Sequence, residues 1–156
     1  MPKVNVATAG SEMLPAIATL EARSFAVPWT ESELRGTAAS PFTVLRIASL
    51  DGQIAGYLCA SVIFEESEIL RIAVLPECRR MGIARALLHH FFDEFPQNAT
   101  FLEVRASNIP ACALYQSEGF TETGLRRNYY EHPTEDAVCM RRESAAPKGI
   151  EPNCAF

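Results

Sequence analysis

Residues 79–84, with the sequence RRMGIA, combine positive charge and backbone flexibility just before a long predicted helix. The first N–H groups of a helix lack partners within the helix and carry a partial positive charge. Gly82 would let a ligand approach the backbone closely, and Arg79 and Arg80 add forked, permanently charged donors. Together these features fit a pyrophosphate or a similar dianion. A solvated loop before an ordinary helix accounts for the same residues equally well, so this stretch alone leaves both interpretations open.

Two other phosphate-binding patterns are excluded by spacing. The chain contains no G-x-x-x-x-G-K-[ST] motif, and it contains no G-x-G-x-x-G motif after a predicted strand. The sequence therefore gives no support to a nucleotide site of either common type.

The elements around RRMGIA would hold it in place. An apolar run over 68–75 predicts a strand that ends before Pro76. After Gly82, apolar residues recur at helical spacing and form one stripe, and Pro96 marks the expected end of the helix. The members of this stripe are Ala84, Leu87, Leu88, Phe91, Phe92 and Phe95.

Strands and helices alternate along the rest of the chain, which indicates an α/β fold. Thr30 and Glu33 form a capping-box pattern at a helix start, and Asp51-Gly52 predicts a hairpin turn. Asn108 is a suitable N-cap and Gly119 a suitable stop for a later helix. The other predicted strands are 3–8, 42–49, 53–64, 101–106, 120–127 and 137–142, and the other predicted helices are 11–25, one starting at Thr30, and 109–118.

The second group of residues with chemical potential lies in LEVRASNIPACALYQSEGF, residues 102–120. A strand, an asparagine, a helix with a tyrosine and a Gly-Phe pair follow R-x-x-G-x-A there, and this arrangement resembles the GNAT superfamily of acetyl-CoA-dependent N-acyltransferases. The stretches LEVRASN, ALYQSEGF, RRNYY, EDAVCM and FAVPWT resemble its bacterial RimI-type branch. The resemblance runs from about Ala7 to Arg142.

The resemblance implies a GNAT fold, with a mixed, mostly antiparallel, twisted sheet of about seven strands and about four flanking helices. It implies one acetyltransferase domain over 1–142 and a C-terminal tail over 143–156. It also implies acetyl-CoA as cosubstrate, direct attack in a ternary complex, and the N-terminal α-amine, expected to be alanine, of a basic small-subunit ribosomal protein as acceptor.

Site residues are carried over from the family by position. The strand before the loop would pair with the pantetheine arm, and the Val74 N–H would face the thioester oxygen. Asn108 would contact the cosubstrate near the pantetheine. The full set implied for cosubstrate binding is Ile72, Ala73, Val74, Arg79, Arg80, Met81, Gly82, Ile83, Ala84, Arg85 and Asn108.

Glu103 matches the family's general base and Tyr115 its general acid. An N-terminal amine titrates near pH 8, so a modest base is enough to remove its proton. A free glutamate, with a pKa of about 4.3, would need burial or a relaying water for that role. A tyrosine, with a pKa of about 10, stays protonated at neutral pH and can protonate a thiolate leaving group.

Each assignment has an alternative. Glu103 could be an ordinary strand carboxylate paired with Arg105 through a neighbouring residue, and Tyr115 could be a core tyrosine. Glu68 is the alternative base, and its acidic run with Glu65 and Glu66 is either a solvated strand end or a patch that attracts a basic peptide. Cys112 is interpreted as a buried packing residue and not as a nucleophile. The aromatic residues Trp29, Tyr129 and Tyr130 either line an acceptor channel or pin loops.

The bulk properties limit the remaining classes. The chain of 156 residues is 48% hydrophobic and 21% charged, as expected for one soluble globular domain, and its net charge of −5 argues against general binding to nucleic acid. Five cysteines without a C-x-x-C pair predict reduced thiols and no metal site. Without a signal peptide or a spanning segment, the expectation is a cytoplasmic protein with no membrane role. The rival functions are acetylation of lysine or small amines, and a non-catalytic CoA-binding module.

Overall fold

The computed structural model describes residues 3–144, so most of the predicted tail lies outside the described residues. Within that range the chain divides into two compact units. The first comprises 3–62 and 68–90, and the second comprises 63–67 and 91–144.

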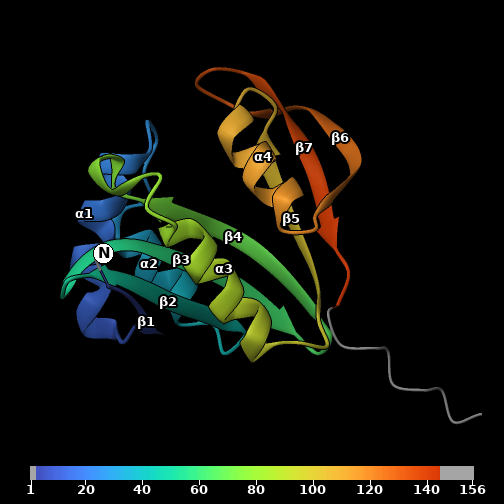
Figure 1. Ribbon diagram of the computed structural model, residues 1–156. Coiled ribbons are helices and arrows are strands. Elements are labelled where there is room, and N and C mark those ends of the chain that lie inside the picture. The colour runs from blue at the N-terminus through green and yellow to red at the C-terminus, as the bar shows by residue number, and fades with distance from the viewer. Residues whose placement is uncertain (1–2, 145–156) are drawn as a thin grey trace, which may run out of the picture. The chain divides into compact units, whose positions relative to one another are not determined.

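The described residues form seven strands and four α-helices, which confirms the predicted α/β class (Figure 1). The sheet has the order β1-β2-β3-β4-β5-β7-β6, so the last strand in sequence lies between the two strands that precede it. The strands are β1 (Val4–Thr8), β2 (Thr43–Leu50), β3 (Gln53–Ile63), β4 (Glu66–Val74), β5 (Ala99–Arg105), β6 (Thr121–Tyr130) and β7 (Glu135–Arg142). The helices are α1 (Leu14–Ser24), α2 (Glu31–Ala38), α3 (Ile83–Glu94) and α4 (Ile109–Ser117), with 3-10 turns η1 (Ser11–Met13) and η2 (Pro76–Cys78).

Local signals in the first unit have the predicted effect. Asp51 and Gly52 both have positive φ, at 50° and 84°, and join β2 to its antiparallel partner β3. Both backbone conformations suit a tight hairpin turn. At the start of α2, the Thr30 side chain accepts a hydrogen bond from the Glu33 N–H, and Glu33 accepts one from the Thr30 N–H. The predicted hairpin and capping box are therefore confirmed.

Helices cover both faces of the sheet in the first unit. Leucines and isoleucines of α1 and α2 pack with Tyr57 and Cys59 of β3 in one buried cluster. The residue next to Tyr57, Gly56, points to the opposite face, where α3 lies (Figure 1). A Cβ atom at Gly56 would lie 2.8 Å from the Ala73 carbonyl oxygen and 3.0 Å from the Ile83 side chain. Gly56 therefore allows β4 and the first turn of α3 to approach β3 closely.

The second unit is built on β5, β7 and β6, which pair antiparallel. Phe120 lies 6.0 Å from Phe92 and 5.6 Å from Tyr115, measured between ring centroids, so aromatic packing fixes α4 on this unit. The sequence prediction ended β6 at Arg127, but the strand continues to Tyr130. Nearly every residue of β6 is exposed, so no alternation of apolar side chains marks where it ends.

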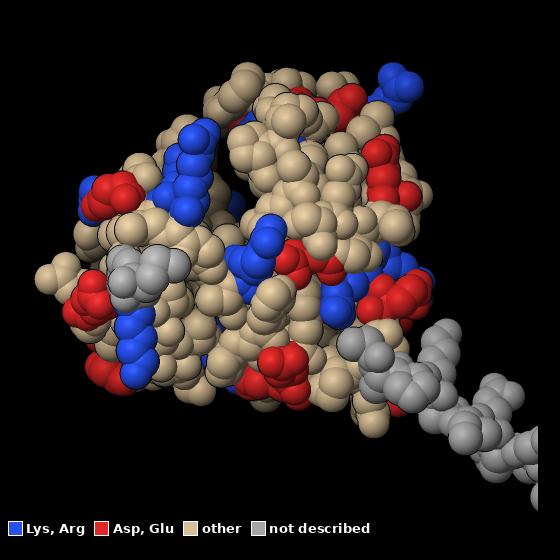
Figure 2. Space-filling view, viewed as in Figure 1, with Lys and Arg blue, Asp and Glu red and all other residues tan. Residues whose placement is uncertain are grey.

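The surface carries mixed charge, and acidic and basic residues are interspersed over the face seen in Figure 2. Among residues 3–144, no helix is both long and apolar enough to cross a bilayer. In the same range, no group of three or more His, Cys, Asp and Glu side chains is placed to hold a metal ion.

Candidate active site

The loop between β4 and α3 contains two left-handed residues immediately before the helix begins. Arg80 and Gly82 both adopt positive φ, at 63° and 77°. The Gly82 carbonyl accepts a hydrogen bond of 2.9 Å from the Ala86 N–H, so the helical bonding of α3 starts there. Arg79, just before the two left-handed residues, is extended, and the N-terminus of α3 adds partial positive charge at the end of the loop. Arg79 and Arg80 are exposed beside this turn.

Gly82 is required by its backbone conformation and not by a crowding neighbour. No protein atom lies within 4 Å of the position that a Cβ atom would take. The open space gives a ligand direct access to the backbone of the turn. The diphosphate of coenzyme A fits these observations, because it needs backbone donors, a close approach and nearby fixed positive charge.

The end of β4 is held firmly against β3. Ala73 is buried, Ile72 and Val74 are half-buried, and the Leu75 N–H donates a 2.8 Å hydrogen bond to the Ala55 carbonyl. All the predicted cosubstrate residues in Ile72–Val74 and Arg79–Arg85 belong to the first unit. They form one continuous segment of strand, turn and helix start.

Glu103 lies on β5 opposite Cys139 of β7, and about 20% of its side chain is exposed. Its Oε1 atom is 2.9 Å from the Nε atom of Arg126. Arg105, the residue named in the alternative interpretation, pairs with Glu135 at 3.6 Å. The Arg126 side chain is 61% exposed, and surface ion pairs of this kind contribute at most about 1 kcal/mol.

Tyr115 lies on α4 and is only 6% exposed, with its ring edge-on to Phe120. Burial raises the pKa of the Tyr115 phenol above its usual value, and the charges of Tyr130 and Cys112 act in the same direction. The phenol is therefore protonated at neutral pH and available as a hydrogen-bond donor. It belongs to the second unit together with Glu103 and Asn108.

Asn108 is the N-cap of α4, as predicted. Its Oδ1 atom accepts a 3.3 Å hydrogen bond from the Ala111 N–H. A carboxamide has one acceptor oxygen and one NH₂ donor group. The cap uses the oxygen, so the NH₂ group is the part of this exposed side chain that suits contact with a ligand.

Three alternative residues are also placed. Glu68 is exposed on β4 in the first unit. Cys112 is half-buried, which corrects the expectation of a buried residue, and its free thiol has a pKa raised by partial desolvation. Its position in the first turns of the short helix α4 leaves it near the surface. Trp29 is partly buried and packs on the core cluster of α1 and α2.

Sequence reasoning missed a buried charged group in the first unit. Glu21 is fully buried on α1 and accepts hydrogen bonds from Tyr57, Arg71 and the Trp29 backbone. The sequence did contain an indication of this, because Glu21 follows Ile17 by one helical turn and therefore lies on the apolar face of α1. A carboxylate at such a position needs partners, and these are too distant in sequence to be read from the helix.

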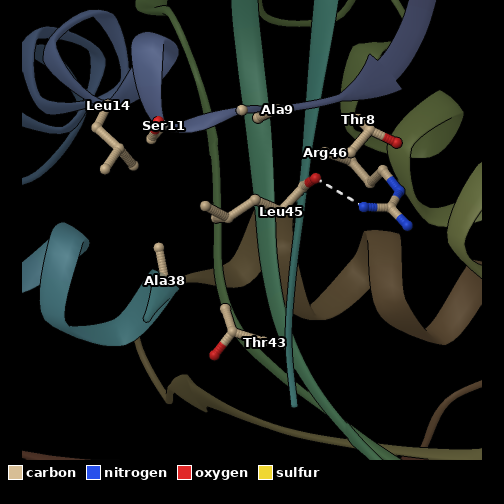
Figure 3. Close-up of a pocket in the computed structure, with 9 residues that line it drawn as sticks. Thr8, Ala9, Ser11, Leu14, Ala38, Thr43, Leu45 and Arg46 are labelled. Atoms are coloured by element: carbon tan, nitrogen blue, oxygen red, sulfur yellow. Dashed lines mark hydrogen bonds between the residues drawn. The ribbon is translucent and has the colours of Figure 1, made fainter. Parts of the chain in front are cut away.

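A cavity of about 200 Å³ lies in the first unit between the end of β1, the start of α1 and β2, and none of the predicted site residues lines it (Figure 3). Its only charged side chain, Arg46, donates a 2.8 Å hydrogen bond to the Leu45 carbonyl. The remaining lining residues are Thr8, Ala9, Gly10, Ser11, Leu14, Ala38 and Thr43. The cavity contains no set of groups that matches the predicted chemistry.

Comparison with known proteins identifies the class. Residues 14–120 match the acetyltransferase (GNAT) family, and the chain belongs to that family. It is 39% identical over 134 residues to the ribosomal protein bS18-alanine N-acetyltransferase of Escherichia coli strain K12, covering 81% of this chain and 88% of that protein. It is 38% identical over 136 residues to the N-alpha-acetyltransferase RimI of Mycobacterium tuberculosis, covering 83% and 86%. The predicted RimI-type resemblance is confirmed.

Solved structures give the same result. The crystal structure of the ribosomal-protein-S18-alanine N-acetyltransferase from Escherichia coli matches with a TM-score of 0.87 at 34% identity, covering 95% of this chain and 99% of that one. Arabidopsis thaliana Naa50, in complex with a bisubstrate analogue, matches with a TM-score of 0.76 at 21% identity, which shows the shared fold alone. The GNAT fold predicted from the sequence is therefore confirmed.

Proposed function

We propose that this protein transfers the acetyl group of acetyl-CoA to the N-terminal α-amine of a protein that begins with alanine, and that this protein is a basic ribosomal protein. The observation that carries the choice of acceptor is the 39% identity, over most of the chain, to an enzyme named for this reaction on bS18. Such an acceptor places the reaction in the cytoplasm and requires no contact with a membrane or with nucleic acid.

The cosubstrate is held by the first unit. The turn Arg79–Gly82 and the first residues of α3, through Arg85, bind the diphosphate, and the backbone of Ile72–Val74 pairs with the pantetheine arm. When bound, acetyl-CoA supplies the acetyl group as an activated thioester. The Val74 N–H stabilises the negative charge that develops on the acetyl oxygen.

In this proposal, Glu103 is the general base and Tyr115 assists the leaving group. The Glu103 carboxylate accepts a proton from the acceptor ammonium, directly or through a water, so that the free amine can attack. As the C–S bond breaks, Tyr115 donates a hydrogen bond to the departing thiolate, and the second proton that the nitrogen releases ends on that sulfur as the free thiol of coenzyme A. An ordinary thiol, with a pKa of about 8.5, is a stronger acid than a buried phenol. Full proton transfer is therefore favoured only if the thiolate is also desolvated, which raises its pKa in the same way.

The charge of the chain suits a basic acceptor. The protein has a net charge of −5, and Glu65, Glu66 and Glu68 are all exposed around the start of β4. Fields of this sign raise the local concentration of a cationic peptide and speed its association.

A peptide panel tests the proposal. Acetyl-CoA is supplied with a basic peptide that has a free N-terminal alanine, and with the same peptide carrying a blocked N-terminus and an internal lysine. Mass spectrometry locates the added acetyl group. Acetylation of the free alanine with little reaction on the blocked peptide is expected. Preference for the blocked peptide would replace this function with lysine acetylation, and no turnover with either peptide would leave a CoA-binding module as the better description.

A further inference from the structure

Glu21 is the centre of a buried network that ties three elements of the first unit together. Its side chain has no exposed surface. Tyr57 of β3 donates its hydroxyl to Glu21 Oε1, and Arg71 of β4 donates Nε to the same oxygen at 2.9 Å. Arg71 also donates to Oε2 at 3.1 Å, which makes the ion pair bidentate. A buried carboxylate is tolerated only when its oxygens are satisfied in this way.

The side chains of Glu21 and Arg71 also bind the segment between α1 and α2, residues 25–29, which we name the FAVPW loop. The Trp29 N–H donates to Glu21 Oε2 at 3.0 Å, and Arg71 donates to the Val27 carbonyl at 3.1 Å. The Arg71 guanidinium also lies 4.0 Å from the ring centroid of Phe25 and 4.8 Å from that of Trp29. The loop is thus fixed at its first, third and fifth residues.

This arrangement uses properties that only arginine has. The planar guanidinium forms a forked pair with a carboxylate while its faces stack on aromatic rings, and one further N–H reaches a carbonyl. A lysine would keep a positive charge beside Glu21, but it could not make the fork, the carbonyl contact and the two ring contacts together. The loop geometry depends on those extra contacts.

The position of Arg71 links the loop to the reaction. Arg71 directly precedes Ile72–Val74, the segment proposed above to lie along the pantetheine arm. The loop presents the Val27 side chain to solvent, 56% exposed, while the Val27 backbone is held by Arg71. An apolar surface anchored beside that strand suits an acceptor whose first residue is small and uncharged.

We propose that Arg71 and Glu21 are positioning residues that hold the FAVPW loop in the conformation that receives the acceptor peptide. This inference rests on the proposed function for the identity of the acceptor. Its consequence is a separation of effects: loss of the network weakens acceptor binding and leaves acetyl-CoA binding intact.

The main test uses Arg71→Lys, which retains a charge for Glu21, with Arg35→Lys as the matched control. Arg35 pairs with Glu31 on exposed α2 and lies in no part of the network. For Arg71→Lys, the KM for the alanine peptide should rise about tenfold while the KM for acetyl-CoA stays within about twofold. Arg35→Lys should change neither. Equal increases in both KM values, or an unchanged peptide KM, would overturn the proposal.

A second readout does not depend on any acceptor. Trp29 is the single tryptophan of the chain, so its fluorescence reports on the FAVPW loop alone. Quenching of Trp29 by acrylamide should increase in Arg71→Lys and in Glu21→Gln, and not in Arg35→Lys. Folded variants that quench like the wild type would overturn the inference, even if the wild type proved inactive on every peptide. That inactivity would instead refute the proposed function.

Discussion

Tyr115 is the proposed hydrogen-bond donor to the departing sulfur. Burial raises the pKa of its phenol and so extends the pH range in which it stays protonated, and the hydroxyl is the only group that Tyr115→Phe removes. We expect kcat to fall about 100-fold, the usual size of a general-acid contribution, while the KM for acetyl-CoA stays within about threefold. Steady-state kinetics with the alanine peptide measures both. Because the pKa of Tyr115 is raised, wild-type kcat should show no alkaline decline from this group below about pH 10.

Cys112 provides the control on the same helix. Cys112→Ala removes the only thiol one turn before Tyr115 and should leave kcat within about twofold, because direct attack needs no covalent carrier. Intersecting double-reciprocal plots for both enzymes would accompany this result. A large loss in Cys112→Ala, or a Tyr115→Phe variant with wild-type kcat, would contradict the proposed roles.

The proposed role of Glu103 as the base predicts how the rate of Glu103→Gln depends on pH. Glu103→Gln removes the proposed base, so the variant should depend on amine that is already deprotonated in solution. Its rate deficit should be largest near pH 6.5 and should shrink toward pH 9, since N-terminal amines titrate near pH 8. Profiles of kcat/KM against pH measure this. A deficit that is constant across the range would move the base elsewhere, and Glu68→Gln would be the next variant to measure.

At the scale of elements, the turn before α3 depends on one backbone conformation. Gly82→Ala places a side chain at φ +77°, which costs roughly 1–2 kcal/mol for an L-residue, although the space around the new Cβ is open. The turn should relax away from its left-handed geometry, and the added methyl group would also occupy the open space beside the backbone. We expect the KM for acetyl-CoA to rise about tenfold, as measured by kinetics or by direct titration with CoA.

Gly36 is the matched control, because it also has open space around a built Cβ but sits in α2 without a positive φ. Gly36→Ala should stabilise the protein by roughly 0.5–1 kcal/mol, by better helix propensity, and should not alter the KM for acetyl-CoA. If both glycine variants bind CoA like the wild type, the turn is not the diphosphate site.

The sequence predicted the elements whose signals are local. The apolar stripe of α3, the capping box at Thr30 and the Asp51-Gly52 turn each depend on contacts within a few residues, and all three are present. The end of β6 was misplaced because that strand is held by pairing with β7 and not by an apolar pattern of its own.

The candidate site was predictable in its residue types and not in its contacts. Glu103, Asn108 and Tyr115 were named from their motif, but the Arg126 partner of Glu103 comes from another strand. Glu21 and its partners are separated by 36 residues to Tyr57 and by 50 to Arg71. No local pattern fixes which distant side chain meets a buried carboxylate, because that is decided by how strands and helices pack.

At the scale of the whole molecule, the buried thiol of Cys59 and the buried phenol of Tyr57 make the free energy of unfolding fall at alkaline pH. Desolvation raises the pKa of Cys59 from 9.0 to about 12, with the charge of Glu21 adding to the effect, and burial also raises the pKa of Tyr57. A pKa raised in the folded state means that the stability is complete below the unfolded pKa and is lost as the pH rises above it. For Cys59 that loss begins near pH 9.

Urea unfolding should therefore show a free energy that falls by about 2 kcal/mol between pH 8 and pH 10.5 from Cys59 alone. In Cys59→Ala the overall level is lower, because a buried side chain has been trimmed, but the decline over this pH interval should be smaller by about that amount. Parallel declines in the two proteins would contradict a buried, neutral Cys59 thiol in the native state.

The free cysteines also restrict which reagents can be used to assay the enzyme. Cys78 directly precedes the Arg79 turn, Cys139 lies opposite Glu103, and both are half-buried free thiols, unlike the inaccessible Cys59. Aromatic disulfide reagents that detect released coenzyme A by colour will also react with such thiols. They would add to the signal and place a bulky adduct next to a proposed cosubstrate loop and a proposed base. A stopped assay that separates acetylated from unmodified peptide by mass keeps the detection chemistry off the enzyme.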